Sequence, residues 1–340
     1  MGRQAIAGGE YGLQIMKRAA VVLGLLLSAA CVAWLVWHVD WKAVGEAVRG
    51  VGLRAWLLGS FIYVLSFLPR ALRWQVMLKP AAAVPLRESL VGVVMGFAAN
   101  NVLPMRLGEV VRAGVLSNRC GVSKVTGLAS VLAEKILDGL CLLLALFVGL
   151  HLSATASGST AFLTWLTRGA VGIFGAATLF LLAFVGFEAQ MVALAGRKLP
   201  PGAPGILLKL AAAFRFLKNG RVLAAALGLT LVVWAVEWAV FFYFLKRLGF
   251  EQAAGRGLFC MAFVNLSILV PSAPGYIGVF QAGAAGAFAV LGLRESSGVA
   301  LSLLIHSAQF IPVTAAGALL APLLGQRWGQ WYQTRRAQDA

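Results

Sequence analysis

The sequence predicts an all-α polytopic membrane protein with six full spans, two oppositely oriented re-entrant hairpins and an inverted repeat. Its composition sets the class, because 60% of the 340 residues are hydrophobic and only 12% are charged, about half the charged share of a soluble domain. A soluble chain of this length could not bury so much apolar surface. Two apolar stretches broken by proline predict the re-entrant hairpins. A repeated order of spans and hairpin along the chain predicts the inverted repeat.

Six apolar stretches are long enough to cross a bilayer as helices of about 20 residues. They cover residues 19–37, 55–78, 125–150, 161–187, 222–245 and 299–324. We interpret the first as a span and not as a cleavable signal peptide, because its apolar run is too long and lacks a convincing cleavage site.

Two further apolar stretches are interrupted by proline. The first covers residues 90–112 and breaks at Pro104, and the second covers residues 257–293 and breaks at Pro271. A glycine follows each of these prolines four residues later. Irregular backbone at membrane depth is tolerated only where protein buries it or where it lines a water-filled cavity, and such breaks point to a transport site. We therefore expect two re-entrant hairpins, one entering from each side.

The charges predict the orientation. The chain has 29 Lys and Arg against 12 Asp and Glu, a net charge of +17. In a soluble chain this excess would suggest nucleic acid, but here the positive-inside rule explains it, and no nucleic-acid partner is expected. With the N-terminus inside, most of the basic residues lie in inside segments. The prediction is a multi-pass protein of the cytoplasmic (inner) membrane with both termini cytoplasmic.

The order of three spans and one hairpin occurs twice along the chain, the second time with inverted topology. Residues 1–150 form the first membrane repeat, with three spans and the cytoplasmic-side hairpin. Residues 151–326 form the second, with three spans and the outer-side hairpin, and residues 327–340 form a cytoplasmic tail. Because the second repeat starts on the opposite side, its hairpin enters from outside.

The first break carries the richest group of polar residues. Pro104 ends a helix and frees backbone carbonyls, and Asn100 and Asn101 can satisfy freed backbone groups or meet a headgroup. Arg106 offers a planar fork suited to phosphate, and Gly108 follows the break. The plainer interpretation is a cytoplasmic loop with snorkelling arginines.

Glu134 and Asp138 are four residues apart on one face of the third span, in the inner half of the bilayer. Intramembrane charges are costly and are usually paired or functional, and Arg106 or Arg112 is the expected partner. Glu109 and Arg112 are three residues apart on one helix face and can pair with each other. The alternative role of this group is to fasten the hairpin to the third span.

Glu237 stands alone in the fifth span. It could pair with Arg168 or Arg256, carry a coupling proton, or be a protonated carboxyl that faces protein. At the second break, the residues expected to shape the transport path are Pro271, Pro274, Gly275, Gly278 and Gln281.

The sequence lacks the motifs of the common enzyme and metal sites. It has no GxxxxGK[ST] loop, GxSxG elbow, HExxH or CxxC, and its three histidines and four cysteines are scattered. We therefore assign no catalytic residue, cofactor or metal, and expect a transporter and not an enzyme.

The stretches NNVLPMRLGEVVR (residues 100–112), EKILD (residues 134–138) and LVPSAPGYIGVF (residues 269–280) resemble the lysylphosphatidylglycerol synthase transmembrane-region family. This family is the flippase-like part of the multiple peptide resistance factor, and the resemblance covers roughly residues 15–325. We expect a stand-alone member without the synthase domain. Lys135 stands where the family usually has Arg, and Gln281 stands where many members have Glu, which puts an acidic role at that hairpin in doubt.

The resemblance implies a translocase that moves a polar-headed lipid between leaflets. An aminoacylated phospholipid, a glycolipid or a hopanoid-type lipid would fit, and Arg106 and Arg112 would attract an anionic headgroup. Membrane lipids are the expected partners, together with a lipid-biosynthesis enzyme, and a homo-oligomer is left open. Two alternatives stay open: a lipid-modifying transferase that uses Glu134 or Asp138 as base, and an accessory subunit of a lipid-synthesis enzyme.

Overall fold

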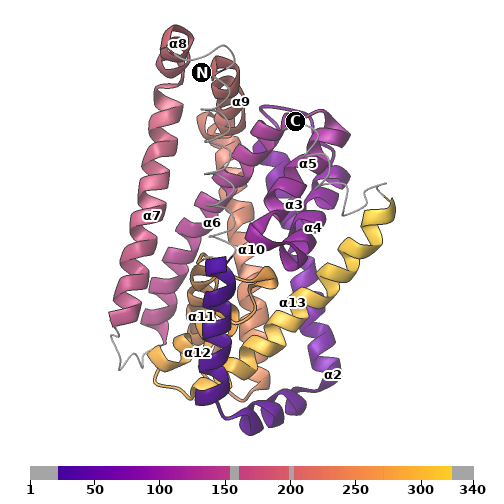
Figure 1. Cartoon of the computed structure of the whole chain (residues 1–340), viewed down its shortest axis with the longest axis vertical. Coiled ribbons are helices and arrows are strands. Elements are labelled where there is room, and N and C mark those ends of the chain that lie inside the picture. The colour runs from indigo at the N-terminus through magenta and orange to yellow at the C-terminus, as the bar shows by residue number, and fades with distance from the viewer. Residues whose placement is uncertain (1–21, 154–160, 199–202, 271, 324–340) are drawn as a thin grey trace.

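The computed structural model describes residues 22–153, 161–198, 203–270 and 272–323, which form helices and no strands (Figure 1). The first described helix is Val22–His38. The later elements are α2 (Trp41–Leu65), α3 (Phe67–Leu78), α4 (Leu86–Val102), η1 (Pro104–Arg106), α5 (Gly108–Cys120), α6 (Lys124–Leu152), α7 (Ala161–Gly186), α8 (Glu188–Lys198), α9 (Ala203–Phe214), η2 (Arg215–Lys218), α10 (Gly220–Arg247), α11 (Ala253–Ser267), η3 (Pro274–Tyr276), α12 (Val279–Val290) and α13 (Glu295–Leu323).

The long apolar helices confirm a multi-pass membrane protein. Among the described residues, three are long and apolar enough to cross a bilayer: Trp41–Leu78, Gly220–Arg247 and Glu295–Pro322. A fourth is added if α7 and α8 count as one span, although they are bent by 76° at their junction. α6 has 29 residues but is not among these three helices. The six full spans therefore stay a prediction.

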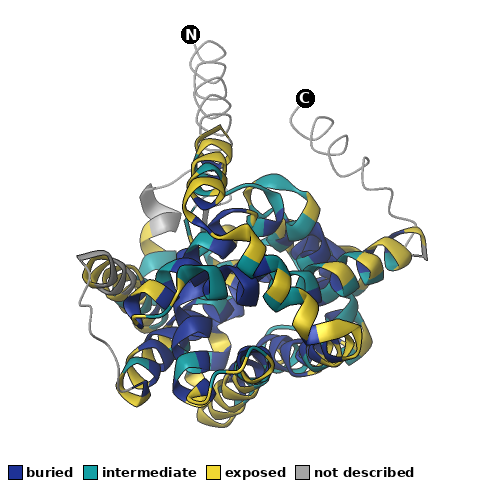
Figure 2. Ribbon diagram, turned by 90° about the horizontal axis from the view of Figure 1, so that it is seen from below, coloured by how far each residue is buried: buried dark blue, intermediate teal, exposed yellow. Residues whose placement is uncertain are grey.

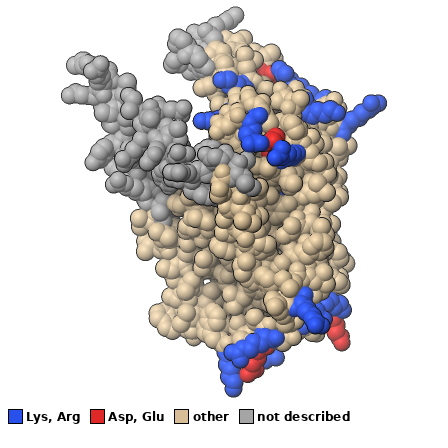
Figure 3. Space-filling view, turned by 90° about the vertical axis from the view of Figure 1, so that its right-hand side faces the viewer, with Lys and Arg blue, Asp and Glu red and all other residues tan. Residues whose placement is uncertain are grey.

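The surface has the pattern of a protein solvated by lipid. Seen from below, the buried residues face the centre of the helix bundle, and the exposed residues lie on its outer side (Figure 2). Many of those outer side chains are large and apolar, such as Leu57 and Phe61 on α2 and Phe180 on α7. On the face shown in Figure 3, charged side chains gather at the two ends and leave an uncharged belt between them. Such a belt suits the hydrocarbon core of a bilayer.

The first broken stretch is a helical hairpin made of α4 and α5. Its two helices come so close that a Cβ at Gly108 would lie 1.9 Å from the carbonyl oxygen of Gly96. The hairpin covers residues 86–120 and is therefore longer at both ends than the predicted 90–112. The extra residues at the start include Arg87 and Glu88, and those at the end continue α5 as far as Cys120. Its tip lies at η1, where Pro104 starts a short 3-10 helix.

The second broken stretch is a helical hairpin of α11 and α12, which covers residues 253–290 against the predicted 257–293. A Cβ at Gly283 of α12 would lie 3.1 Å from the Cβ of Ser267 at the end of α11. α4 starts at the end of the molecule where α3 stops, and α11 starts at the opposite end, where α10 stops (Figure 1). The two hairpins thus approach from opposite ends and their tips touch, since η1 contacts η3. Their re-entrant placement in a bilayer stays a prediction, as does the division into two repeats.

An exposed ion pair joins the open ends of the first hairpin. Arg119, in the last turn of α5, donates two hydrogen bonds to the carboxylate of Glu88, in the first turn of α4. This hydrogen bonding lowers the pKa of Glu88 from its ordinary value. A carboxyl whose pKa is lowered by folding stabilises the fold at neutral pH and loses that contribution as the pH falls into the acidic range.

We expect Glu88→Gln to lower the free energy of unfolding by less than about 1 kcal/mol, because the pair is partly exposed. The loss should be seen at neutral pH and should vanish in acid, where Glu88 of the parent protein is also neutral. Thermal unfolding in detergent at several pH values checks this. A deficit that persists unchanged in acid would contradict the ion-pair explanation, and Arg119→Gln should reproduce the same pH dependence.

Candidate functional site

A buried network of charges lies between the first hairpin and the long helices. Arg112 of α5 donates to both carboxylate oxygens of Glu134, with its Nη2 atom 2.8 Å from Oε2 and its Nη1 atom 3.1 Å from Oε1. Arg73 of α3 joins the two acidic residues of α6, because its Nη2 lies 2.8 Å from Glu134 Oε1 and its Nη1 lies 2.5 Å from Asp138 Oδ1. All four side chains are buried. The network contains two positive and two negative charges and is neutral.

Neighbouring aromatic and hydroxyl groups complete this network. The guanidinium of Arg112 lies 3.8 Å above the ring of Trp74, and the Trp74 indole donates to Ser130 on α6 at 2.9 Å. Trp234 of α10 donates to Asp138 at 2.9 Å, and Arg73 donates to Thr230 at 3.0 Å. A guanidinium stacked on an aromatic face is a favourable arrangement for a buried arginine. The network thus fastens α3, α5, α6 and α10 together.

The predicted ion pairs are right for one partner and wrong for others. Arg112 is a partner of Glu134, as expected. Arg106 pairs with neither acidic residue, because it lies at the hairpin tip. The predicted pair of Glu109 with Arg112 is also wrong: Glu109 lies 3.4 Å from Lys135. α5 directs Arg112 inward against α6, whereas Glu109 and Lys135 lie nearer the surface of the hairpin.

Glu237 pairs with Arg70 and not with Arg168 or Arg256. Its Oε1 atom accepts a hydrogen bond from Arg70, and its Oε2 atom lies 3.2 Å from the amide nitrogen of Gln309 on α13. The Arg70 guanidinium also lies 4.9 Å from the ring centre of Phe97 on α4. This second pair is buried and neutral. A role of Glu237 in proton coupling is not tested by this arrangement and stays a proposal.

Arg70 and Arg73 are the site residues that the sequence analysis missed. They lie in the second half of the predicted span at residues 55–78. One signal could have found them: they lie three residues apart on one helix face, and the acidic residues of two other spans needed cationic partners. The structure places both arginines inside the helix bundle.

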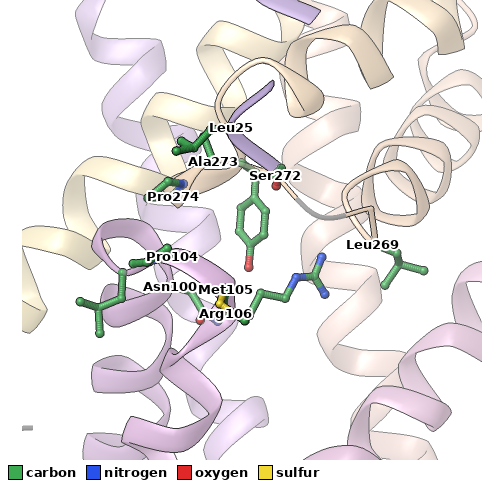
Figure 4. Close-up of a pocket in the computed structure, with 11 residues that line it drawn as sticks. Leu25, Asn100, Pro104, Met105, Arg106, Leu269, Ser272, Ala273 and Pro274 are labelled. Atoms are coloured by element: carbon green, nitrogen blue, oxygen red, sulfur yellow. The ribbon is translucent and has the colours of Figure 1, made fainter. Parts of the chain in front are cut away.

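The two hairpin tips meet through Arg106 (Figure 4). Its Nη2 atom donates to the backbone carbonyl of Ile268, which follows the last turn of α11. Its guanidinium lies 5.3 Å from the ring centre of Tyr276 in η3. Met105, Arg106 and Tyr276 have φ values of 58°, 53° and 60°. Such left-handed conformations are uncommon for residues other than glycine, and they cluster at functional sites.

The asparagines of the first tip make hydrogen bonds within the protein, and their contact with a headgroup stays a prediction. Asn100 accepts from the backbone amide of Gly108 at 2.8 Å. Asn101 donates to Thr314 on α13 at 2.9 Å. Asn100 therefore holds the start of α5 against the end of α4, and Asn101 fastens the tip to the last long helix.

The second tip is built from glycine and neutral polar groups. Gly278 has a φ of +87°, and its amide donates to Gln281 Oε1 at 2.9 Å. The Gln281 side-chain nitrogen is 2.9 Å from His306 Nδ1, so Gln281 fastens the tip to α13. Gly275, which follows Pro274 in η3, has a φ of +66°. Pro271 lies outside the described residues.

Two cavities flank the contact between the tips. The smaller, of about 250 Å³, is lined by both tips and by Leu25 of the first described helix. The larger, of about 290 Å³, extends between α3, α4, α6, α10 and α13 and reaches both ion-pair groups at Asp138 and Glu237. Four residues line both cavities: Asn100, Arg106, Leu269 and Tyr276. The two cavities therefore meet at these residues of the hairpin tips.

The larger cavity carries several charged side chains in a mostly apolar lining. Its lining includes these charged residues: Arg70, Arg106, Glu109, Lys135, Asp138 and Glu237. Asn265, Gln309 and several aromatic rings add neutral polar and apolar surface. Within the described part of the chain, no group of three His, Cys, Asp or Glu side chains could hold a metal ion. The arrangement can bind a polar group by hydrogen bonds and charge.

Comparisons with known proteins agree with the resemblance in the motifs. The family model described as "Lysylphosphatidylglycerol synthase TM region" matches residues 21–317. One curated relative is the protein named "Glycosyltransferase AglD" of Haloferax volcanii, which is 23% identical over 344 aligned residues. That alignment covers 92% of this chain but 52% of the relative, so the chain spans about half of the relative's length. No solved structure matches the chain.

Proposed function

This chain belongs to the lysylphosphatidylglycerol synthase transmembrane-region family, and from that premise we propose that it is a translocase that moves a polar-headed lipid between leaflets. One observation carries the proposal. A polar cavity of about 290 Å³ lies where two hairpin tips meet, midway along a molecule whose surface there is an uncharged belt (Figure 3). A lipid headgroup that moves between leaflets must cross the bilayer at that depth, where it needs polar partners.

The cavity would lower the barrier that keeps a headgroup in its own leaflet. Moving a polar group into hydrocarbon without hydrogen bonds costs several kcal/mol, and moving a charge costs more. The side chains around the cavity would replace the lost water while the acyl tails stay in the bilayer. A volume of about 290 Å³ holds on the order of ten water molecules, enough for a small headgroup and part of its hydration shell.

In this proposal the two hairpin tips are the moving parts. Arg106 contacts Ile268 and Tyr276 where the two cavities meet, and parting of the tips would widen the path between them. The two inverted halves would rock against one another around the ion-pair groups. Placement in the inner membrane with both termini cytoplasmic, and proton coupling through Glu237, belong to the same proposal.

A reconstituted leaflet-exchange assay tests this function. In a variant with the native cysteines replaced, Met105→Cys and Ser272→Cys place one thiol on each tip, beside the same cavity. We expect the untreated protein to exchange fluorescent polar lipids between leaflets. A reducible bifunctional thiol reagent should slow exchange at least about tenfold, because the tips can no longer part, and reduction should restore it.

The matched control carries Met105→Cys alone and receives the same reagent, so that it is modified but not bridged. Its exchange rate should stay near that of the untreated protein. Exchange no faster than in protein-free vesicles for every polar lipid tried would contradict translocation. Full exchange by the bridged protein would contradict the role of the tips.

A lipid-modifying transferase is a second candidate function, which the printed name of the Haloferax volcanii relative favours. In that case a carboxylate at the cavity, such as Glu109 or Asp138, would act as base. Mass spectrometry of the vesicle lipids separates the candidates, because a transferase changes the mass of its lipid and a translocase does not. A partnership with a lipid-biosynthesis enzyme is compatible with both.

A further inference from the structure

The carboxylates at the tip cavities already have cationic partners. Glu237 is paired with Arg70, and Glu109 lies 3.4 Å from Lys135. Asp138 shares Arg73 with Glu134, which is also held by Arg112. Each of these groups is neutral as a unit. A cationic headgroup would therefore find no unshared carboxylate among the described residues that line the cavities.

Among the described charged residues that line the two cavities, Arg106 has no ionic partner. In the described part of the chain it contacts no carboxylate, and its partner is the carbonyl of Ile268 behind the last turn of α11. The C-terminus of a helix carries about half a negative charge, so this contact offsets the guanidinium only in part. A guanidinium has five N–H donors, and one of them is used by Ile268. Because Arg106 lines both cavities, a ligand can reach it from either one.

The backbone holds Arg106 at this place in a conformation that its side chain does not favour. Arg106, its neighbour Met105 and the facing Tyr276 all have left-handed φ values between 53° and 60°. Other parts of the fold must therefore impose that conformation. The hydrogen bonds of Asn100 to Gly108 and of Asn101 to Thr314 supply such a constraint. Arg106 therefore has both a left-handed backbone conformation and an unpaired charge.

The smaller cavity suits a lipid because its outer edge is apolar. Leu25, Met105 and Leu269 line it and are between 40% and 48% exposed. The polar groups on its inner side are neutral, and they include Asn100, Ser272 and the Tyr276 hydroxyl. A headgroup could thus sit against Arg106 while its tails leave across the apolar edge (Figure 4).

We infer that Arg106 binds the phosphodiester of a lipid headgroup that carries one negative charge and otherwise neutral hydroxyl groups. That the ligand is a lipid rests on the proposed function. The preference for a negatively charged headgroup rests only on the ion pairs of the cavity carboxylates. Arginine suits a phosphodiester because its planar fork can donate to two oxygens. Headgroups with an added ammonium, such as aminoacylated phospholipids, are disfavoured because the acidic residues are already engaged.

A binding experiment on the purified full chain tests the charge preference. Four lipids with the same tails are titrated in neutral detergent and bound lipid is counted by native mass spectrometry: phosphatidylglycerol, lysylphosphatidylglycerol, phosphatidylethanolamine and a neutral monoglycosyl diacylglycerol. We expect phosphatidylglycerol to bind at least tenfold more tightly than each of the others. Arg106→Gln should abolish the preference, and Arg106→Lys should retain part of it.

Arg49→Gln is the matched control, because Arg49 is an exposed arginine of α2 away from both cavities, and it should leave the preference unchanged. Equal binding of all four lipids, or an unchanged preference in Arg106→Gln, would overturn the inference. Soluble glycerophosphoglycerol should bind at least tenfold more weakly than phosphatidylglycerol, and equal affinity would overturn the assignment to a lipid.

Leaflet exchange measured on the same preparations separates the inference from the proposed function. Selective binding without leaflet exchange would contradict the translocase function and would support the Arg106 site. A rate of leaflet exchange that does not depend on headgroup charge, with no selective binding, would contradict the Arg106 site and would support the translocase function.

Discussion

Replacing Arg73 by methionine is expected to lower the free energy of unfolding by about 3–5 kcal/mol. Arg73 is fully buried and lies between Glu134 and Asp138. Without it, two buried carboxylates share the single positive charge of Arg112. An uncompensated buried charge is far more costly than the loss of a neutral pair. Unfolding of the purified protein in mixed micelles, followed by circular dichroism, measures the loss.

The double variant Arg73→Met/Asp138→Asn should recover a large part of this stability. It restores neutrality by leaving Arg112 with Glu134, and the asparagine can still accept the hydrogen bond from Trp234. Arg49→Met is the control for the loss of an exposed arginine and should change the free energy of unfolding by less than about 0.5 kcal/mol. If the double variant is less stable than Arg73→Met alone, the explanation by charge balance is wrong.

Replacing Gly108 by alanine should force the first hairpin apart. The new Cβ would lie 1.9 Å from the carbonyl oxygen of Gly96 and 2.5 Å from Oδ1 of Asn100. The oxygen of Gly96 belongs to the backbone of α4 and cannot rotate away, so α4 and α5 must separate. Overpacking of this kind costs about 1–3 kcal/mol or more, and lipid exchange should fall because the tip shifts with α5.

Gly45→Ala provides the matched comparison, because a Cβ at Gly45 meets nothing within 4 Å. Alanine is the better helix former, so this variant should be as stable as the parent protein or slightly more so. Both variants are to be measured by thermal unfolding and by leaflet exchange. A Gly108→Ala protein with parental stability and exchange would show that the hairpin is not packed as closely as the structure indicates.

The sequence was most informative where one local residue decides the backbone. Pro104 marks the first tip, and Asn100 satisfies a backbone amide as predicted. Pro274, Gly275 and Gly278 likewise mark the second. Family membership also followed from short motifs around these breaks. A helix break depends on its own neighbours, and so it can be read from a single chain.

The sequence was least informative about long-range pairing. Arg73 meets Asp138 across 65 positions and Arg70 meets Glu237 across 167, and nothing local selects these partners over Arg112, Arg168 or Arg256. The ends of the hairpins also differ from the prediction, which gave 90–112 and 257–293 where the helices cover 86–120 and 253–290. Likewise, the sequence analysis did not foresee that Arg106 contacts Ile268 and Tyr276 of the other tip.

The pairing of buried charges also restricts how this chain can diverge over time. Because the groups around Glu134, Asp138 and Glu237 are each neutral, a descendant that loses one acidic residue inherits a stranded cation until a second substitution removes it. Change at these positions should therefore proceed by joint replacement, with a fragile ancestor between the two stable forms. Arg106, which has no carboxylate counterpart in the described residues, is exempt from that requirement and can be exchanged in one step.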